Sequence, residues 1–400
     1  MKKTISLYFL YYLRFFARLQ IKKIKLLNPK LVIVGITGSA GKTSTLLAME
    51  ATLKPELRVK TNYGGNSESG IPLNILDFKN PNFSFFSWLK IAILAPIKLL
   101  INWKVYDIYL VEMGIDSSQS PKNMSYLLSI IKPDVGVFLN VNPVHLQSFS
   151  SLDQIAEEKA KLVNSAKVAI INTTDPLVKK YTRHKKTISI KPLHLDIPHY
   201  FLPSIYQISL GAAISVAKYL KIDQNTAQTN LINNFRLPPS RSSIFKGQNN
   251  STIIDSSYNS SPLATAEMLK FLSTFPSPKV AILGDMRELG KATQISHTNL
   301  YKTALKTADT IISVGPETSR YFGNKSKKFL YWWQAADHLK DNLPLDATIL
   351  IKGSQNTIFL EEIVKFLLKY PSDSKKICRQ SSYWIKLKSN FRNSKELSIT

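Results

Sequence analysis

Residues 35–45 read GITGSAGKTST and directly follow the apolar run LVIV at 31–34. A short β-branched strand, a glycine-rich turn and then helix-forming residues are typical of a phosphate-binding loop. Gly38 and Gly41 have no side chain, so the backbone can curl and point its N–H groups at an anion. This stretch therefore predicts an α/β fold in which a strand leads into a helix at a phosphate group.

The side chains of the loop support a nucleoside triphosphate as the ligand. Lys42 would add a point charge near the outer phosphates, and Thr43 would offer a hydroxyl to Mg²⁺. The full motif has a glycine at the position of Ile36, whereas the glycine here is Gly35, one residue earlier. A glycine turn that happens to precede a lysine is the simpler alternative. The predicted nucleotide-binding residues of the loop are Gly38, Ser39, Ala40, Gly41, Lys42, Thr43 and Ser44.

The charge of the chain predicts an anionic partner. Its 400 residues contain 53 Lys plus Arg against 27 Asp plus Glu, a net charge of +26. Nucleic acid, acidic lipid headgroups and a phosphorylated substrate would each fit such an excess. No nucleic-acid recognition motif is present, so no specific nucleic acid is expected. The single Cys378 excludes a disulfide framework and favours a cytoplasmic location.

Two apolar segments raise the question of membrane contact. Residues 1–30 are rich in aromatic and basic residues, too charged to span a bilayer, and suit an interfacial helix on anionic lipid. The segment 83–106 is interrupted by Lys90, Pro96 and Lys98. It could form a membrane-dipping hairpin, a buried core element or a partner-binding face. Packing within the protein is the simpler interpretation of both segments, and peripheral contact with the inner face of the membrane is the alternative.

From residue 31 onward, strand and helix patterns alternate, which predicts mainly parallel sheets covered by helices. The fold class expected is α/β, with a central P-loop ATPase-type domain and a C-terminal Rossmann-like α/β domain. Two prolines after Leu237 mark the boundary. Residues 183–204 suggest an edge hairpin, and the C-terminal segment suggests a loosely ordered, polar and basic tail. The predicted segments are 1–30, 31–236, 237–371 and 372–400.

Several polar residues follow predicted strands, where α/β sheets bind their ligands. Glu112 is a candidate Mg²⁺ ligand, because this ion prefers oxygen donors and takes few protein groups. His145 and Lys159 follow the next strand, although a lone histidine is more often structural and a helix lysine more often solvated. Asp255 ends a strand in the second half of the chain. The loops 284–290 and 351–354 end two further strands there.

Taken together, these motifs resemble the Mur ligases in order and spacing over about residues 31–370. The branch it most resembles adds D-Ala-D-Ala to a muramoyl peptide in peptidoglycan precursor synthesis. The resemblance implies that ATP activates a carboxylate as an acyl phosphate, which an amine then attacks to give an amide, ADP and phosphate. The segments that carry it are GITGSAGKTST, NSESGIPLNIL, VEMG, NVNPVHLQSFSSLDQIAEEKAKLV, INTTDP, IIDSSYNSSP, AILGDMRELG and IKGS.

The resemblance also implies roles for single residues. Lys42 would neutralise the outer phosphates, and Lys159 would become a carbamate that accepts a hard cation. The implied catalytic residues are Lys42, Lys159 and His145, and the implied metal ligands are Thr43, Glu112, His145 and Lys159. The implied nucleotide contacts of the C-terminal domain are Arg241, Asp255, Tyr258 and Asn259.

Departures from the family pattern leave more than one function open. Ser256, Ser261 and Gln355 stand where the family has an acid, an asparagine and an arginine. Only about 30 residues precede the nucleotide domain, where the family has a UDP-sugar-binding domain, so a lipid-linked or otherwise different acceptor is one expectation. The chain could also be a ligase acting on another carboxylate, or a non-catalytic, membrane-associated nucleotide-binding module.

Overall fold

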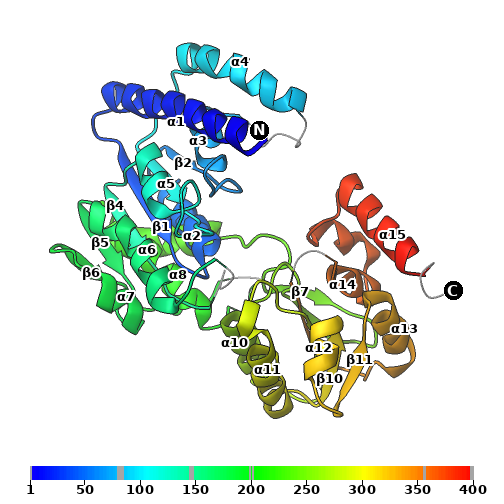
Figure 1. Ribbon diagram of the computed structural model, residues 1–400. Coiled ribbons are helices and arrows are strands. Elements are labelled where there is room, and N and C mark those ends of the chain that lie inside the picture. The colour runs from blue at the N-terminus through cyan, green and yellow to red at the C-terminus, as the bar shows by residue number, and fades with distance from the viewer. Residues whose placement is uncertain are drawn as a thin grey trace. The chain divides into compact units, whose positions relative to one another are not determined.

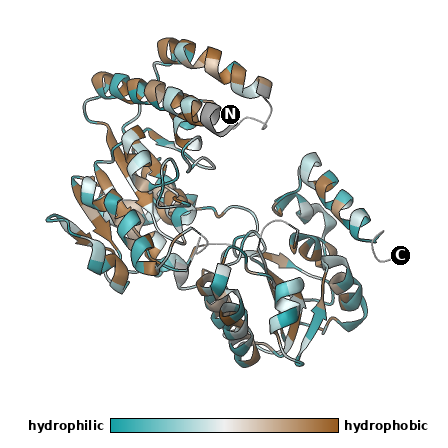
Figure 2. Cartoon of the chain, in the orientation of Figure 1, coloured by the Kyte–Doolittle hydropathy of each residue, from teal (hydrophilic) through white to brown (hydrophobic). Residues whose placement is uncertain are grey.

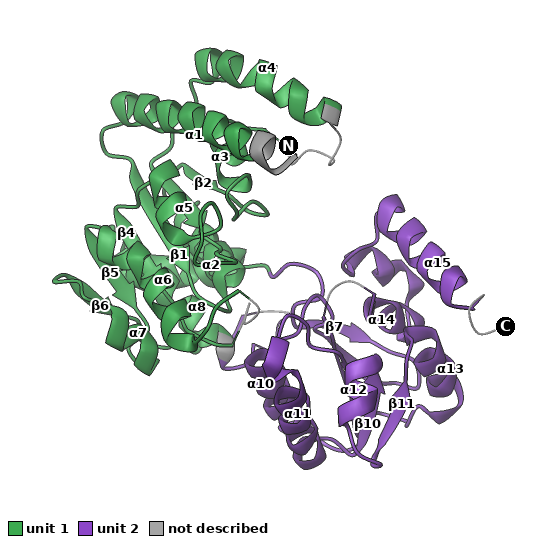
Figure 3. Cartoon of the chain, in the orientation of Figure 1, with its two compact units in different colours: residues 1–195, 206–236 green, residues 196–205, 237–400 purple. Residues whose placement is uncertain are grey.

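A computed structural model of the chain describes residues 2–78, 85–143, 148–197, 200, 202–354 and 357–396 (Figure 1). The chain divides into two compact units, each built on its own sheet. The first unit holds residues 1–195 and 206–236, and the second holds residues 196–205 and 237–400 (Figure 3).

The sheet of the first unit is parallel throughout its described pairs and has the strand order β2-β3-β1-β4-β5-β6. Its central strands are continuous buried apolar runs, as expected for a parallel sheet with helices on both faces. The predicted mainly parallel α/β fold is confirmed for this unit. The strands are β1 (Val32–Thr37), β2 (Val59–Thr61), β3 (Ile108–Glu112), β4 (Val135–Phe138), β5 (Val168–Ile171) and β6 (Thr187–Ser189).

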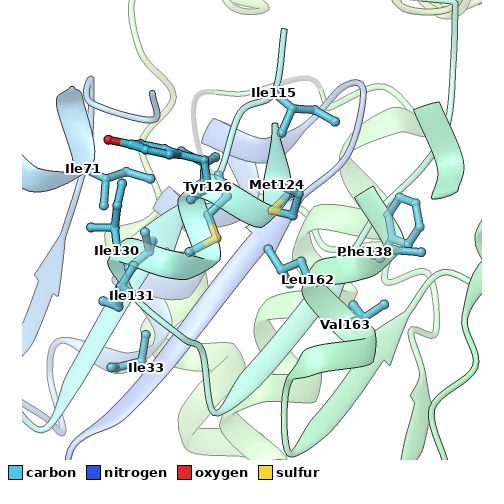
Figure 4. Packing of buried hydrophobic residues seen from close by; sticks show 14 of the residues in the cluster. Ile33, Ile71, Ile115, Met124, Tyr126, Ile130, Ile131, Phe138, Leu162 and Val163 are labelled. Carbon is cyan, nitrogen blue, oxygen red and sulfur yellow. The ribbon is translucent and has the colours of Figure 1, made fainter. Parts of the chain in front are cut away.

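Helices pack closely onto this sheet. A Cβ atom at Gly136 of β4 would lie only 2.8 Å from the Cα atom of Val163, so α6 approaches the strand at backbone distance. Ile33, Phe138 and Leu162 belong to the core that this packing encloses (Figure 4). The helices are α1 (Lys2–Leu27), α2 (Lys42–Leu53), α3 (Gly70–Ile75), α4 (Phe85–Ile101), α5 (Met124–Ile130), α6 (Leu152–Ser165), α7 (Pro176–Tyr181), α8 (Ile205–Tyr219) and α9 (Gln224–Asn234).

The first apolar segment is not a separate surface helix. One side of α1 packs against α3, α4 and α5, and Leu13, Ala17 and Ile24 on that side are buried. The second segment forms the single helix α4 rather than a hairpin. Within the part of the chain that is described, no helix is long and apolar enough to cross a membrane.

The second unit has a sheet of order β11-β10-β9-β12-β8-β7, parallel except for the antiparallel pair of β7 with β8. Neighbouring residues of its strands belong to different apolar clusters, such as Ile253 and Ile254, so both faces are covered. The strands are β7 (Ser243–Lys246), β8 (Thr252–Asp255), β9 (Lys279–Gly284), β10 (Thr310–Val314), β11 (Ser326–Phe329) and β12 (Thr348–Lys352). The helices are α10 (Pro262–Leu272), η1 (Gly290–Ala292), α11 (Thr293–Thr307), α12 (Pro316–Tyr321), α13 (Trp332–Asn342), α14 (Glu361–Leu367), η2 (Pro371–Lys376) and α15 (Ser382–Glu396).

Two local predictions are wrong. The only strand described in the segment 183–204 is β6, which pairs in parallel with β5 and forms no hairpin. The C-terminal segment is not loosely ordered, because residues 382–396 form α15. Its Lys388 is buried and forms ion pairs with Glu361 and Glu362, which replace the hydration that the polar composition led us to expect.

Candidate active site at the phosphate loop

The loop between β1 and α2 (Figure 1) has a backbone conformation that requires glycine at two positions. Gly41 caps α2 with a φ of 81°, a left-handed conformation that side chains other than glycine rarely adopt. At Gly38 the reason is space, because a Cβ atom there would lie 3.0 Å from the Cβ atom of Leu139. The first amides of α2 have no intrahelical partner and give this end of the helix its affinity for an anion.

Asn140, which follows β4, holds the loop in place. Its backbone carbonyl accepts a hydrogen bond from the Ser39 amide at 3.0 Å, and its side-chain oxygen accepts one from the Ala40 amide at 2.8 Å. Its side-chain amide donates to the Ala40 carbonyl at 3.1 Å. Sequence analysis missed this residue. Its position two residues after a buried strand was the signal that could have identified it.

Two lysines from distant parts of the chain meet at the loop. Lys42 donates to the Gly38 carbonyl at 3.0 Å, and Lys159 donates to the same carbonyl at 3.2 Å. Lys159 lies on α6, which begins where the Ser151 side chain accepts a hydrogen bond from the Gln154 amide. The helix thus carries a lysine to the loop from more than a hundred residues away.

The Lys159 side chain is only 2% exposed. Burial holds the pKa of its amine well below the ordinary value, and the nearby Lys42 charge lowers it further. Asp116, Glu112 and Glu158 act in the opposite direction. The neutral amine is therefore easier to reach at this position than in a solvated surface lysine.

Thr43 and Glu112 come together as the sequence predicts. The Thr43 hydroxyl donates to one Glu112 carboxylate oxygen at 2.9 Å, and the Asn66 amide donates to the other at 2.8 Å. Asn62 fixes the backbone of Glu112 by accepting from its amide at 2.7 Å and donating to its carbonyl at 2.8 Å. The carboxylate is therefore held in one orientation by Thr43 at the start of α2 and by Asn66 in the loop that follows β2.

Part of the phosphate loop, Asn66 and Lys159 line a cavity on the first unit. Beyond the predicted loop residues and Lys159, the cavity brings in Asn66 and Asp116, neither of which had been predicted as a site residue. Asn66 begins the segment NSESGIPLNIL, and Asp116 follows VEMG after one intervening residue, but neither segment assigns the residue a role by itself. The lining residues are Ser39, Lys42, Asn66, Ser67, Gly114, Ile115, Asp116 and Lys159.

The site fits a magnesium-bound triphosphate in its chemistry. A threonine hydroxyl and a carboxylate are hard oxygen donors, and Mg²⁺ typically takes one or two such groups and completes its shell with phosphate and water. The described residues contain no group of three or more His, Cys, Asp or Glu side chains arranged for a metal. His145, the other predicted ligand, lies outside the described residues.

In the second unit, the predicted residue Asp255 is saturated by protein groups. One of its oxygens accepts from the Ser240 hydroxyl at 2.6 Å, and the other accepts from the Ser257 amide at 3.0 Å and hydroxyl at 2.7 Å. Burial raises the pKa of Asp255. These contacts give Asp255 a part in shaping the loop that carries Tyr258 and Asn259.

Two guanidinium groups approach the ring of Tyr258. Arg241 stands 4.5 Å from the centre of its ring, and Arg379 stands 5.3 Å from it. Arg379 also donates to the Tyr258 carbonyl at 2.5 Å and to Glu361 at 3.1 Å. The loop that carries the half-buried Tyr258 and the exposed Asn259 is thus stabilised by Arg379. The sequence had placed Arg379 in a loosely ordered tail.

Comparison with known families gives two adjoining matches. Residues 36–236 match the Mur ligase middle domain, and residues 240–355 match the glutamate ligase domain of Mur ligases. The UDP-N-acetylmuramoyl-tripeptide–D-alanyl-D-alanine ligase of Buchnera aphidicola is 25% identical over 393 residues. That alignment covers 88% of this chain and 79% of the relative.

Solved structures have the same fold. The chain is similar to MurF from Acinetobacter baumannii, with a TM-score of 0.72 and 20% identity, over 89% of this chain and 80% of that structure. It is also similar to the MurF ligase from Thermotoga maritima in complex with ADP, with a TM-score of 0.68 and 23% identity, over 89% and 84%.

Proposed function

The chain belongs to the Mur ligase family, and we propose that it uses ATP to join D-Ala-D-Ala to the carboxylate of a muramoyl peptide. The observation that carries the proposal is that the phosphate loop and the buried Lys159 line one cavity. Asn66 of the same lining donates to Glu112, the hydrogen-bond partner of Thr43. The activity after which the relatives are named agrees with this chemistry. Peptidoglycan precursor synthesis is the process to which such a ligase contributes.

In this proposal the first unit transfers the terminal phosphoryl group of ATP to the acceptor carboxylate. The loop amides and Lys42 hold the phosphate chain and offset the negative charge that spreads over the transferring group. Thr43 and Glu112 would hold Mg²⁺, which would supply further charge neutralisation when bound. The carboxylate thereby gains a phosphate as leaving group, and the donor amine can displace it to form the amide.

Lys159 has a separate proposed role, as a carbamate. A neutral lysine amine can add to CO₂ and lose a proton, which gives a group with carboxylate oxygens in place of an ammonium. Such oxygens suit a hard cation, whereas an ammonium repels it. The low pKa of Lys159 and its burial beside Lys42 support this role. His145 remains a proposed ligand next to it.

The proposed domains are an ATP-binding domain at 31–236 and a C-terminal ligase domain at 237–371, flanked by α1 and the segment with α15. In the second domain, Arg241, Tyr258 and Asn259 are proposed to contact the nucleotide. For Asp255 we propose an indirect role, because its carboxylate oxygens are already engaged by Ser240 and Ser257. A reaction that consumes ATP, together with a single buried cysteine, supports a cytoplasmic location.

The test is a ligation assay with ATP, Mg²⁺, D-Ala-D-Ala and UDP-muramoyl-tripeptide, followed by mass spectrometry. The expected product is the muramoyl pentapeptide with one ADP released for each amide formed. Parallel reactions with glutamate or ammonia in place of D-Ala-D-Ala distinguish this activity from that of a ligase that uses another amine. ATP consumption without a new amide in any combination would contradict the proposal.

A further inference from the structure

The helix α4 has an apolar face on its outer side. Phe86 is 80% exposed and Ile93 is 60% exposed, and they belong to a series that recurs every three or four residues. This spacing places the whole series on one side of a helix. The exposed apolar residues of α4 are Phe86, Leu89, Ile93, Ile97, Leu100 and Ile101, and Trp103 is exposed just beyond the helix.

This face is additional to the one by which α4 packs on the protein. Ile91 and Ala95, on the inner side, are buried with Leu13 of α1 and with Leu73 and Leu76. An ordinary amphipathic helix would present polar residues to water once its inner side is buried. Figure 2 shows the hydrophobic colouring along α4. A contiguous exposed apolar face of this kind marks an interaction site.

Polar contacts hold α4 in this orientation. Pro96 has no N–H group to donate to the Ala92 carbonyl, and the Tyr12 hydroxyl of α1 donates to that carbonyl instead, at 2.7 Å. Lys23 donates to the Leu99 carbonyl at 2.7 Å, and Gln20 donates to the Asn102 carbonyl at 3.1 Å. The orientation of the apolar face is thus fixed by the fold of the first unit.

The charges of α1 and α4 indicate which kind of partner this face would bind. Neither α1 nor α4 contains an aspartate or a glutamate. Lys90 is exposed within the apolar series of α4, and Arg18 and Lys22 are exposed elsewhere on the neighbouring α1. The Lys23 ammonium also lies 3.7 Å from the centre of the Trp103 ring, so a cation sits directly beside an exposed aromatic group. Apolar residues flanked by bases and free of acids are typical of helices that lie on anionic lipid.

We infer that the outer face of α4, with Trp103 and the bases of α1, docks the protein onto an anionic lipid bilayer. The apolar side chains would enter the interface while the lysines and arginines contact the headgroups. A second copy of the chain fits less well, because a symmetric contact would bring the same bases face to face. The inference concerns a surface apart from the phosphate loop and does not depend on the substrates of the ligase.

The first test measures sedimentation of the full chain with vesicles. We expect binding to vesicles of equimolar phosphatidylcholine and phosphatidylglycerol that weakens with salt, and little binding to phosphatidylcholine alone. The double variant Ile93→Glu with Ile97→Glu should bind at least about tenfold more weakly. Because both side chains are exposed, its circular dichroism and melting temperature should match the parent chain.

The matched control is Ile295→Glu, because Ile295 is an isoleucine of α11 in the second unit with a similar exposure of 62%. It should bind vesicles like the parent chain. A second pair of variants tests whether the position of the positive charges, and not only their number, matters for binding. Replacing the exposed Arg18, Lys22 and Lys90 by Gln should reduce binding and its salt dependence. Replacing the exposed Lys291, Lys302 and Lys306 of η1 and α11 by Gln should change binding much less.

Three results would overturn the inference. The parent chain could fail to bind the anionic vesicles, or the Ile93/Ile97 variant could bind them as well as the Ile295 control. Alternatively, sedimentation velocity without lipid could show a dimer that this double variant alone dissolves, which would make the face a contact between two copies.

Discussion

Lys159 in the first unit and Lys352 in the second are both buried lysines, 2% and 4% exposed, whose pKa is lowered chiefly by burial. Their surroundings differ. Lys159 lines a cavity beside Lys42, whereas Lys352 donates to the Asn259 carbonyl at 2.9 Å and to a serine hydroxyl at 3.4 Å. A perturbed pKa therefore does not by itself identify a reactive group. The cavity distinguishes a lysine poised for chemistry from one that holds a loop.

The largest effect on activity is expected from replacing Lys42, which lies beside Lys159 at the phosphate loop. Lys42→Ala should lower kcat by about 1,000-fold, because the charge that offsets the transferring phosphoryl group is lost. ATP-dependent amide formation under saturating substrates is the measurement. The exposed Lys54 at the other end of α2 provides the control Lys54→Ala, which should retain full activity. Equal activities of the two variants would remove Lys42 from the proposed machinery.

Lys159→Ala should lower activity by about 100-fold through loss of the proposed carbamate. If that carbamate is the active form, acetate should restore part of the activity, since its carboxylate can occupy the vacated space. The control on the same helix is Lys161→Ala, whose side chain is 42% exposed. Full activity of Lys159→Ala would show that this buried lysine resembles Lys352 after all.

Replacing Lys352 should change the free energy of unfolding rather than the rate of catalysis. Burial lowers its pKa to about 7 in the folded protein, against about 10.4 when unfolded. Between these two pH values the unfolded chain binds more protons than the folded chain. The contribution of Lys352 to the free energy of unfolding therefore increases as the pH rises from 7 to about 10.4, and it is lost as the pH is lowered toward 7. The rise is at most about 1.4 kcal/mol per pH unit.

Urea unfolding at pH 7.5 and pH 9 measures this effect. The parent chain should gain about 2 kcal/mol relative to Lys352→Met between these two pH values. Lys328→Met removes an exposed lysine of β11 and should keep the pH dependence of the parent chain. Identical pH dependence in the parent chain and Lys352→Met would contradict the assigned ionisation of Lys352.

A smaller effect is expected at Asn66, which orients Glu112. Asn66→Ala should raise the Mg²⁺ concentration needed for half-maximal activity by about tenfold, with less change in kcat at saturating Mg²⁺. Asn74→Ala is a useful comparison, because Asn74 donates to the Thr61 carbonyl and lies outside the cavity. A fall in kcat that excess Mg²⁺ cannot restore would contradict a positioning role for Asn66.

The sequence predicted those parts of the site that are local or that end a strand. The phosphate loop is contiguous, and Glu112 ends β3, so both could be recognised without the structure. The family and the class of ATP-dependent, amide-forming ligase are confirmed by the domain matches. Asn140, Asn66 and Asp116 were missed, although Asn140 and Asn66 each begin a segment that carries the family resemblance. Their roles depend on contacts with residues far away in the sequence, which the segments themselves do not record.

The errors have local physical causes. Pro96 and two lysines left a hairpin open as one of three alternatives for the second apolar segment, and the structure excludes it, because Tyr12 supplies the donor that proline lacks and the helix continues. Similarly, the polar C-terminal segment suggested disorder, but Arg379 and Lys388 find buried carboxylate partners. In both places the deciding contact comes from residues distant in sequence.

The central claim is that ATP activates the acceptor carboxylate at the phosphate-loop cavity. The most direct measurement labels both oxygens of the acceptor carboxylate with ¹⁸O and follows the label by mass spectrometry during ligation. One labelled oxygen should appear in each phosphate released, because the phosphoryl group leaves with an oxygen of that carboxylate. Amide formation with unlabelled phosphate would contradict the account.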